Sequence, residues 1–156
     1  MASKFLQPAR NRFAMKAMLL HQKKLIEQHC QFIKCRMEKN VLVCKGVISN
    51  PDFRNRYEVE IRCVYGSEPY TRILQPASIV PSPEIHMYSD HSLCLHYPQD
   101  LKWSAWTLIY KYTIPWLVEW IIYYELYLVN GGKWEGPESP VHITDDEKNI
   151  PNNINL

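Results

Sequence analysis

The spacing of apolar residues changes from a helical period of 3.6 to a period of two near residue 33, and this change determines what the chain can fold into. From residue 33 onward, apolar and polar side chains alternate in two segments, at Ile33, Cys35 and Met37 and again at Tyr57, Val59, Ile61, Cys63 and Tyr65. A period of two predicts β-strands with one buried face. Residues 41–48 form a more uniformly apolar strand between them, and the turns at 38–40 and 49–52 are short enough for antiparallel hairpins. A fourth strand is expected at 71–80, with Pro76 placing it at an edge or a bulge.

A helix is expected on each side of the strands. Residues 8–28 place Phe13, Ala17 and Leu20 on one face at helical spacing, and we expect that face to pack on the core. The face is broadened by Met15, Met18, Leu25 and Ile26. Strands lying between two helices predict an α+β fold. A chain of 156 residues is long enough for one domain, which we assign to residues 1–143, with a polar and flexible tail at 144–156.

The second expected helix, residues 113–129, is the most apolar segment. Pro115 falls in its first turn, and the Asn-Gly-Gly sequence at 130–132 predicts its end. Apolar residues cover almost its whole circumference, so we expect burial on most sides, with Trp116 and Trp120 in the core. The segment is nearly as long as a membrane span, but its glutamates at 119 and 125 favour a helix inside a soluble domain.

Composition excludes several functional classes. A net charge of +2 does not favour a nucleic-acid partner. The five cysteines form no Cys-x-x-Cys pair, which predicts free thiols in a reducing compartment, with no disulfide framework, metal site or cofactor. The first residues lack the apolar core of a signal peptide, so a cytoplasmic protein is expected.

The segment around Cys94 contains the most reactive chemistry. It follows a polar turn at 89–92, which would bring the thiol to the surface. A thiol that holds an acyl group must ionise readily, be reachable by a large partner and lie beside an oxyanion donor. His86, His91 and His96 lie within a few residues, and any of them could favour the thiolate or relay a proton. For at least two of the three, an ordinary surface histidine is the alternative interpretation.

Residues 93–104 resemble the active-site region of the ubiquitin-conjugating enzymes, in which a Cys-Leu pair precedes a Trp-Ser pair. Here these pairs are Cys94-Leu95 and Trp103-Ser104. With the Leu-Cys-Leu-His-Tyr-Pro run, the tryptophan-rich segment 116–120, the Trp-Glu-Gly at 134–136 and His142, the chain looks like the bacterial branch of this family. That branch occurs in antiviral operons for cyclic-oligonucleotide signalling (CBASS), beside a cGAS-like nucleotidyltransferase. The resemblance covers residues 8–142 and suggests the short form, without an activating domain on this chain.

The resemblance implies a ubiquitin-conjugating fold and an acyl transferase. Cys94 would carry the C-terminus of the nucleotidyltransferase as a thioester and pass it to an amine. His86 occupies the position of the family's asparagine, where it would stabilise the loop or the oxyanion. His96 and His142 would handle protons or tune the pKa of the thiol, with His91 and Trp103 as further supporting residues.

A basic stripe on the first helix has two interpretations. Arg12, Lys16 and Lys23 project within a narrow arc. Because the first helix of ubiquitin-conjugating enzymes commonly meets the activating partner, the stripe is a candidate partner-binding surface. A solvated helix face is the alternative.

Three other functions are compatible with the same residues. A non-catalytic scaffold would bind the nucleotidyltransferase without using Cys94. A cysteine hydrolase would pair Cys94 with His86 or His142 and release the acyl group to water. A purely structural domain with five buried thiols would leave Cys94 resistant to alkylation in the native protein.

Overall fold

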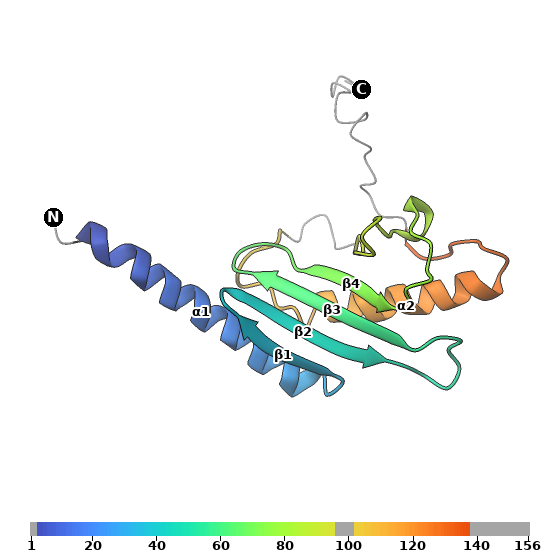
Figure 1. The fold of residues 1–156 in the computed structure, drawn as a ribbon, viewed down its shortest axis with the longest axis horizontal. Helices are drawn as coiled ribbons and strands as arrows, with labels where there is room; N and C mark the ends of the chain where they lie inside the picture. The colour runs from blue at the N-terminus through green and yellow to red at the C-terminus, as the bar shows by residue number, and fades with distance from the viewer. Residues whose placement is uncertain (1–2, 96–101, 138–156) are drawn as a thin grey trace, which may run out of the picture.

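The computed structural model describes residues 3–95 and 102–137, and the side chains from residue 11 onward within these ranges. Its elements are, in order, α1 (Ser3–His29), β1 (Ile33–Glu38), β2 (Val41–Ile48), β3 (Tyr57–Val64), β4 (Tyr70–Gln75), the 3-10 helix η1 (Pro83–Ile85) and α2 (Thr113–Val129). The strands form one antiparallel sheet in the order β1-β2-β3-β4 (Figure 1). The α+β fold, with an N-terminal helix, a four-stranded antiparallel sheet and a C-terminal helix, is confirmed.

The fourth strand is shorter than expected. It ends at Gln75 instead of residue 80, directly before Pro76. Proline has no N–H to donate to a strand ladder, so pairing stops where it appears. β4 is the last strand of the sheet, in agreement with the edge position that Pro76 predicted.

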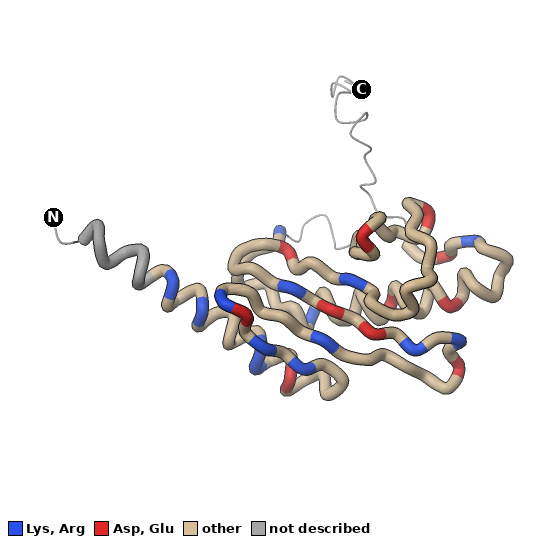
Figure 2. Tube along the Cα trace, in the orientation of Figure 1, with Lys and Arg blue, Asp and Glu red and all other residues tan. Residues whose placement is uncertain are grey.

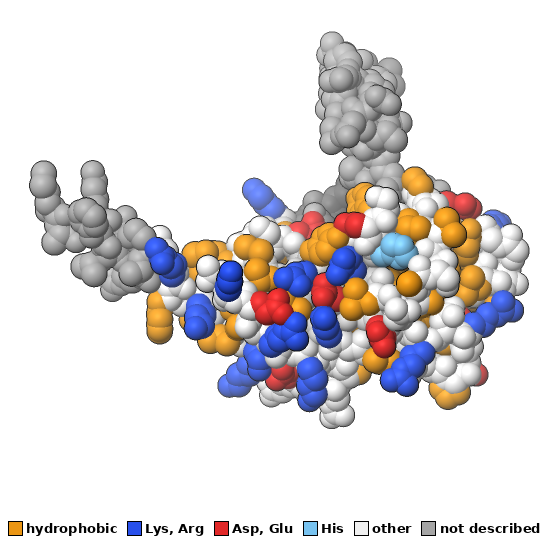
Figure 3. All heavy atoms as spheres, viewed as in Figure 1, with side chains coloured by type: hydrophobic (Ala, Val, Ile, Leu, Met, Phe, Trp, Pro, Cys, Tyr) orange, Lys and Arg blue, Asp and Glu red, His pale blue; other side chains and the backbone are white. Residues whose placement is uncertain are grey.

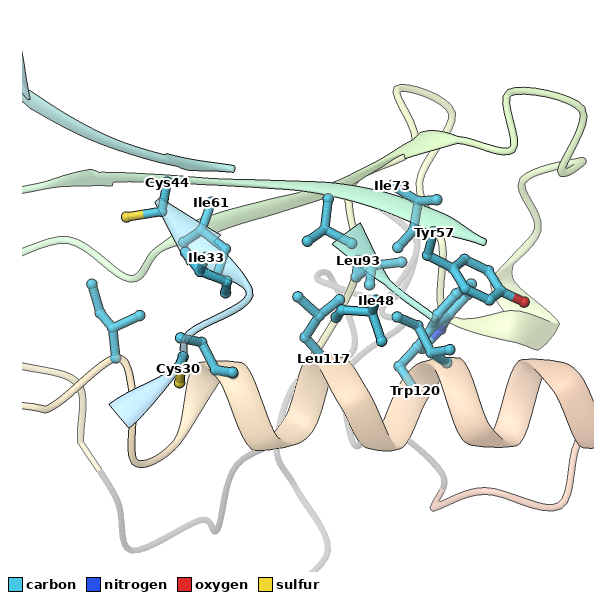
Figure 4. Packing of buried hydrophobic residues seen from close by; sticks show 14 of the residues in the cluster. Cys30, Ile33, Cys44, Ile48, Tyr57, Ile61, Ile73, Leu93, Leu117 and Trp120 are labelled. Carbon is cyan, nitrogen blue, oxygen red and sulfur yellow. The ribbon is translucent and has the colours of Figure 1, made fainter. Parts of the chain in front are cut away.

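The core lies between one face of the sheet and the helices. Leu117 and Trp120 point from α2 toward the strands, where they meet side chains such as Ile48 and Leu93 (Figure 4). The alternation in the strands accounts for this arrangement, because successive side chains point to opposite faces of a sheet. Tyr57, at the start of β3, is fully buried at one end of the core.

The opposite face of the sheet is charged. Glu60, whose side chain is only 5% exposed, pairs there with Lys45 at 3.6 Å, Arg62 at 3.9 Å and Arg72 at 3.0 Å. Basic and acidic positions follow one another along the strands in Figure 2, and basic side chains gather over them in Figure 3. Val43, in register with Arg36 and Arg62, is also buried on this face, and the main apolar core lies on the other.

The expected core face of α1 is wrong at Phe13, Ala17 and Leu20 and is confirmed at Ile26. Phe13 is 77% exposed and Leu20 is 43% exposed, whereas Leu19, Gln22 and Ile26 are buried. The N-terminal part of the helix extends past the sheet, where no strand covers it (Figure 1). The rotation of the helix places the Gln22 amide where Nε2 donates to the Thr107 carbonyl at 2.8 Å and Oε1 accepts from the Ile109 N–H at 3.1 Å.

The expected burial of α2 on most sides is confirmed, except along one exposed stripe through Pro115, Glu119, Ile122, Leu126 and Val129. Ile122 and Leu126 are each 44% exposed, and Val129 is 58% exposed. The sheet covers one side of the helix, so the opposite side meets solvent despite its apolar residues. No helix in the described part of the chain is long and apolar enough to cross a membrane.

Glu125 is a buried carboxylate within this apolar helix. It accepts hydrogen bonds from the N–H groups of Arg54 at 2.8 Å and Asn55 at 3.2 Å, and from the Tyr57 hydroxyl at 2.5 Å. Burial, together with the hydrogen bond to Glu125, raises the pKa of Tyr57. The carboxylate therefore attaches the loop before β3 to α2.

Replacing Glu125 with alanine is expected to destabilise the fold by about 2 to 4 kcal/mol. The change leaves a buried hydroxyl and two loop N–H groups without their acceptor, and each unsatisfied group costs roughly 1 to 3 kcal/mol unless water reaches it. Urea unfolding of Glu125→Ala measures the change in the free energy of unfolding. Glu119→Ala, which removes an exposed carboxylate from the same helix, is expected to change it by less than about 0.5 kcal/mol. Equal effects of the two variants would contradict the role of Glu125.

Candidate active site at Cys94

A short hairpin holds the cysteine segment against the edge of the sheet. Within it, Met87 pairs with Leu93, and the Tyr88 N–H donates to the Ser92 carbonyl at 2.8 Å. The hairpin joins β4 through main-chain bonds from the Leu93 N–H to the Thr71 carbonyl (2.8 Å) and from the Ile73 N–H to the His91 carbonyl (3.1 Å). The main chain therefore fixes the position of the residue that follows, Cys94.

Asp90 closes the turn of this hairpin. Its carboxylate accepts the Ser92 N–H at 2.9 Å, the Ser92 hydroxyl at 2.6 Å and the Tyr70 hydroxyl. The hydrogen bonds from the Ser92 and Tyr70 side chains lower the pKa of Asp90 to about 2. His91 adopts a left-handed conformation with φ 66°, which turns the chain back toward β4. The polar turn expected before the cysteine is thus a closed, hydrogen-bonded structure.

Cys94 differs from the other four cysteines in exposure. Cys30, Cys35, Cys44 and Cys63 are buried, whereas Cys94 is partly exposed and all five are free thiols. Burial raises the pKa of the Cys63 thiol to about 11, and a hydrogen bond with Cys35 together with burial raises that of Cys44. The four buried thiols therefore belong to the core, and Cys94 is the thiol that a reactant can reach.

Tyr88 contacts the sulfur of Cys94, a role that the sequence did not indicate. A side-chain hydrogen bond with Cys94 is the main reason why the pKa of Tyr88 rises to about 12. The hydroxyl therefore stays protonated near neutral pH and can donate to the sulfur. Tyr88 precedes Cys94 by six positions and reaches it because the hairpin folds the two strands together, which no local sequence pattern shows.

His86 lies next to Cys94 across the start of the hairpin. Its carbonyl accepts the Cys94 N–H at 2.9 Å, and its backbone is left-handed with φ 57°. The side chain is 8% exposed, and its ring meets Trp134 edge-on with centroids 5.4 Å apart. The structure therefore brings together the two residues that the sequence analysis placed in the catalytic roles.

An aromatic pocket of about 80 Å³ opens beside the two residues. The described residues that line it are His86, Cys94, Leu95, Trp116, Glu119, Trp120, Tyr123, Trp134 and Pro137. Trp120 is buried, and its indole N–H donates to the Ile85 carbonyl at 2.7 Å. That bond holds the loop carrying His86 against α2.

The expected burial of Trp116 is wrong. Its side chain is partly exposed and forms part of the pocket wall, because Trp116 lies to one side of the stripe of α2 that meets the sheet. The pocket residues on α2 have the spacing of one helix face, a pattern that could have been found in the sequence.

The other predicted site residues lie elsewhere. His91 is partly exposed in the hairpin turn, and Trp103 lines a separate shallow hollow against α1 with Leu19 and Gln22. His96 and His142 lie outside the described residues. Within the described part of the chain, no group of three or more His, Cys, Asp or Glu side chains could hold a metal ion.

The residues of the basic stripe differ in their surroundings. Arg12 and Lys16 are exposed on the first half of α1. Lys23 is partly buried and pairs with Glu27 at 3.3 Å. Two of the three side chains are therefore unobstructed on the described surface, and the third already has a partner.

Comparison with known proteins identifies the family of the chain. No curated protein matches the chain. A family model described as Type II CBASS E2 protein matches residues 22–142, which include the sheet, the Cys94 hairpin and α2. The chain belongs to the family of Type II CBASS E2 proteins.

Proposed function

We propose that this protein is a cysteine-dependent acyl carrier and transferase in CBASS antiviral signalling. Cys94 holds the C-terminal carboxyl of a cGAS-like nucleotidyltransferase as a thioester and passes it to an amine. Membership of the family supports an E2-like role. The observation that supports the chemistry is one reachable thiol, hydrogen-bonded to Tyr88, that lines a pocket together with His86.

The proposed reaction has two steps. The Cys94 thiolate attacks the carbonyl carbon of an activated tail, either an acyl adenylate or a thioester on an activating protein. A C–S bond forms, and AMP or the other thiolate leaves. A neutral amine then attacks the same carbon, a C–N bond forms, the Cys94 thiolate leaves and the surplus proton passes to water. His86 is our candidate donor to the oxyanion of each tetrahedral intermediate.

Intact mass spectrometry tests the carrier function. The protein is co-expressed with the nucleotidyltransferase of its own CBASS operon and analysed with and without hydroxylamine. The expected result is an adduct with the mass of the nucleotidyltransferase minus one water, which hydroxylamine releases. A tight complex that forms no adduct would favour the scaffold. Release of the nucleotidyltransferase from Cys94 with a free C-terminal carboxyl, in the absence of any amine, would favour the hydrolase.

Replacing Tyr88 with phenylalanine is expected to slow the reaction of Cys94 with iodoacetamide about fivefold at pH 7. The change removes the hydrogen bond from the Tyr88 hydroxyl to the Cys94 sulfur. A bond worth roughly 1 kcal/mol corresponds to a fivefold change in rate. The rate is measured by mass spectrometry after brief exposure of the folded protein to the reagent.

Tyr70→Phe is the matched control, because the Tyr70 hydroxyl bonds to Asp90 in the same hairpin. It should leave the alkylation rate unchanged. If both variants slow the reaction equally, looseness of the hairpin is responsible, and Tyr88 has no direct role at the sulfur.

A further inference from the structure

Two buried cysteines face each other across the first two strands of the sheet. Cys35 of β1 and Cys44 of β2 are directly paired in the antiparallel register. The Cys35 N–H donates to the Glu27 carboxylate of α1 at 2.9 Å, so it is not bonded to β2. The cysteines therefore form a non-hydrogen-bonded pair, the type whose Cα atoms lie about 4.5 Å apart. That separation falls within the range of about 4.4 to 6.8 Å over which a disulfide can close.

The two thiols are already in contact. Both side chains belong to the core cluster, where Cys35 is 9% exposed and Cys44 is 1% exposed. A hydrogen bond joins the thiols and contributes to holding the pKa of Cys44 above its usual range. Because the main chain already has a suitable separation, side-chain rotation is enough to bring the sulfur atoms to bonding distance.

The other thiols are less well placed to react with this pair. Cys63 is in register with Leu42, so it lies diagonally from Cys44 across β2 and β3. Diagonal neighbours are about 7 to 8 Å apart, beyond the reach of a disulfide. Cys94 follows the hairpin bonded to β4, at the opposite edge of the sheet from β1. Figure 4 shows Cys44 at the end of the core away from Trp120, which lines the Cys94 pocket.

The pair lies at an edge of the sheet, where a small molecule can reach it. β1 is bonded to β2 alone, so local separation of these two strands uncovers Cys35. Buried thiols react slowly, because the charged thiolate is disfavoured away from water. A brief exposure to iodoacetamide should therefore modify Cys94 first. Hydrogen peroxide is close to water in size, and we expect it to reach Cys35 over hours.

We propose that Cys35 and Cys44 are a redox site that a hydroperoxide converts to a cross-strand disulfide, separately from Cys94. The Cys35 thiolate attacks one oxygen of hydrogen peroxide and the O–O bond breaks. A sulfenic acid forms, and the leaving hydroxide takes the proton released by Cys35 to become water. The Cys44 sulfur then attacks the Cys35 sulfur, the S–O bond breaks, and a second water leaves with the Cys44 proton. Overall, two thiols lose two hydrogen atoms and one peroxide is reduced to two waters.

The disulfide acts on the attachment of α1 to the sheet. Glu27 of α1 is bonded to the Cys35 N–H, a main-chain group that oxidation leaves in place. A covalent bond from Cys35 to Cys44 ties the strand that holds α1 to the second strand of the sheet. Oxidation therefore fixes α1 more firmly, at the edge of the sheet opposite the Cys94 hairpin.

Peptide mapping of the oxidised Cys94→Ala protein tests the proposal. The substitution removes the most exposed thiol, which would otherwise consume the peroxide. The folded protein is incubated with hydrogen peroxide, its free thiols are blocked with N-ethylmaleimide in urea, and trypsin is added without reductant. Trypsin isolates Cys35 in the peptide 35–36 and Cys44 in the peptide 40–45. The expected product is these two peptides joined with the loss of two hydrogen atoms, and dithiothreitol should separate them.

Two further substitutions in the same background are matched controls. Cys63→Ala removes a neighbouring buried thiol and should leave the link unchanged, whereas Cys44→Ala should abolish it. A link from Cys35 to Cys30 or Cys63 would overturn the proposal, and so would oxidation to sulfinic or sulfonic acid alone. Absence of any reaction in the folded Cys94→Ala protein would overturn it as well. The thioester experiment depends on Cys94, so its result is independent of this one.

Discussion

The Cys94→Ala variant is expected to form no covalent adduct with the nucleotidyltransferase and to keep the melting temperature of the native protein. The sulfur is the proposed nucleophile, so no other atom of the side chain can replace it. The thiol is partly exposed, and the one main-chain bond made by the Cys94 N–H, to the His86 carbonyl, is retained in alanine. Substitutions at such positions usually change stability by less than about 0.5 kcal/mol. Intact mass spectrometry and thermal unfolding measure the two properties.

Cys63→Ala is the matched control. This thiol is 5% exposed in the core, so its removal should cost about 1 to 2 kcal/mol and leave adduct formation intact. The opposite pattern, with a destabilised Cys94→Ala that still forms the adduct, would make Cys94 a packing residue. It would also direct the search for the nucleophile elsewhere.

Trp120→Ala is expected to cause the largest loss of stability among the pocket residues, about 3 to 5 kcal/mol. The indole is 4% exposed, stacks on Tyr124 and donates to the Ile85 carbonyl. Its removal leaves a cavity and an unpaired carbonyl next to His86. Because domains are commonly stable by only 5 to 15 kcal/mol, the variant should unfold at a much lower urea concentration.

Trp116→Ala separates packing from pocket function. This indole is partly exposed, so its truncation should cost roughly 1 kcal/mol while removing one wall of the pocket. Urea unfolding of both variants provides the comparison. Equal destabilisation would show that Trp116 is as important to the core as Trp120.

Spacing in the sequence predicts most of the fold. The alternation at residues 33–38 and 57–65 predicted two strands, and the glycines at 131 and 132 predicted the end of α2 at Val129. The core side of α1 was predicted at Ile26 but not at Leu19 and Gln22. Gln22 is buried there because its amide bonds to Thr107 and Ile109, and these partners lie more than 80 positions away. A polar residue on a core face shows its partners only after the chain has folded.

The site was predicted in part for the same reason. Cys94 and His86 were chosen from their neighbours and from a family resemblance, and the hairpin places them next to each other. Tyr88 was missed because its contact with the sulfur depends on hairpin pairing. Glu119 was considered only as a charge that argues against a membrane span, because its position beside three indoles requires the return of Trp134.

The attachment of the Cys94 hairpin to β4 has a consequence for how this family can diverge. The bonds that position the hairpin join main-chain atoms of Thr71, Ile73, His91 and Leu93. Main-chain bonds persist when the side chains around them are exchanged. Side chains of the hairpin other than Asp90, whose carboxylate closes the turn, can therefore be exchanged by mutation while the thiol keeps its place.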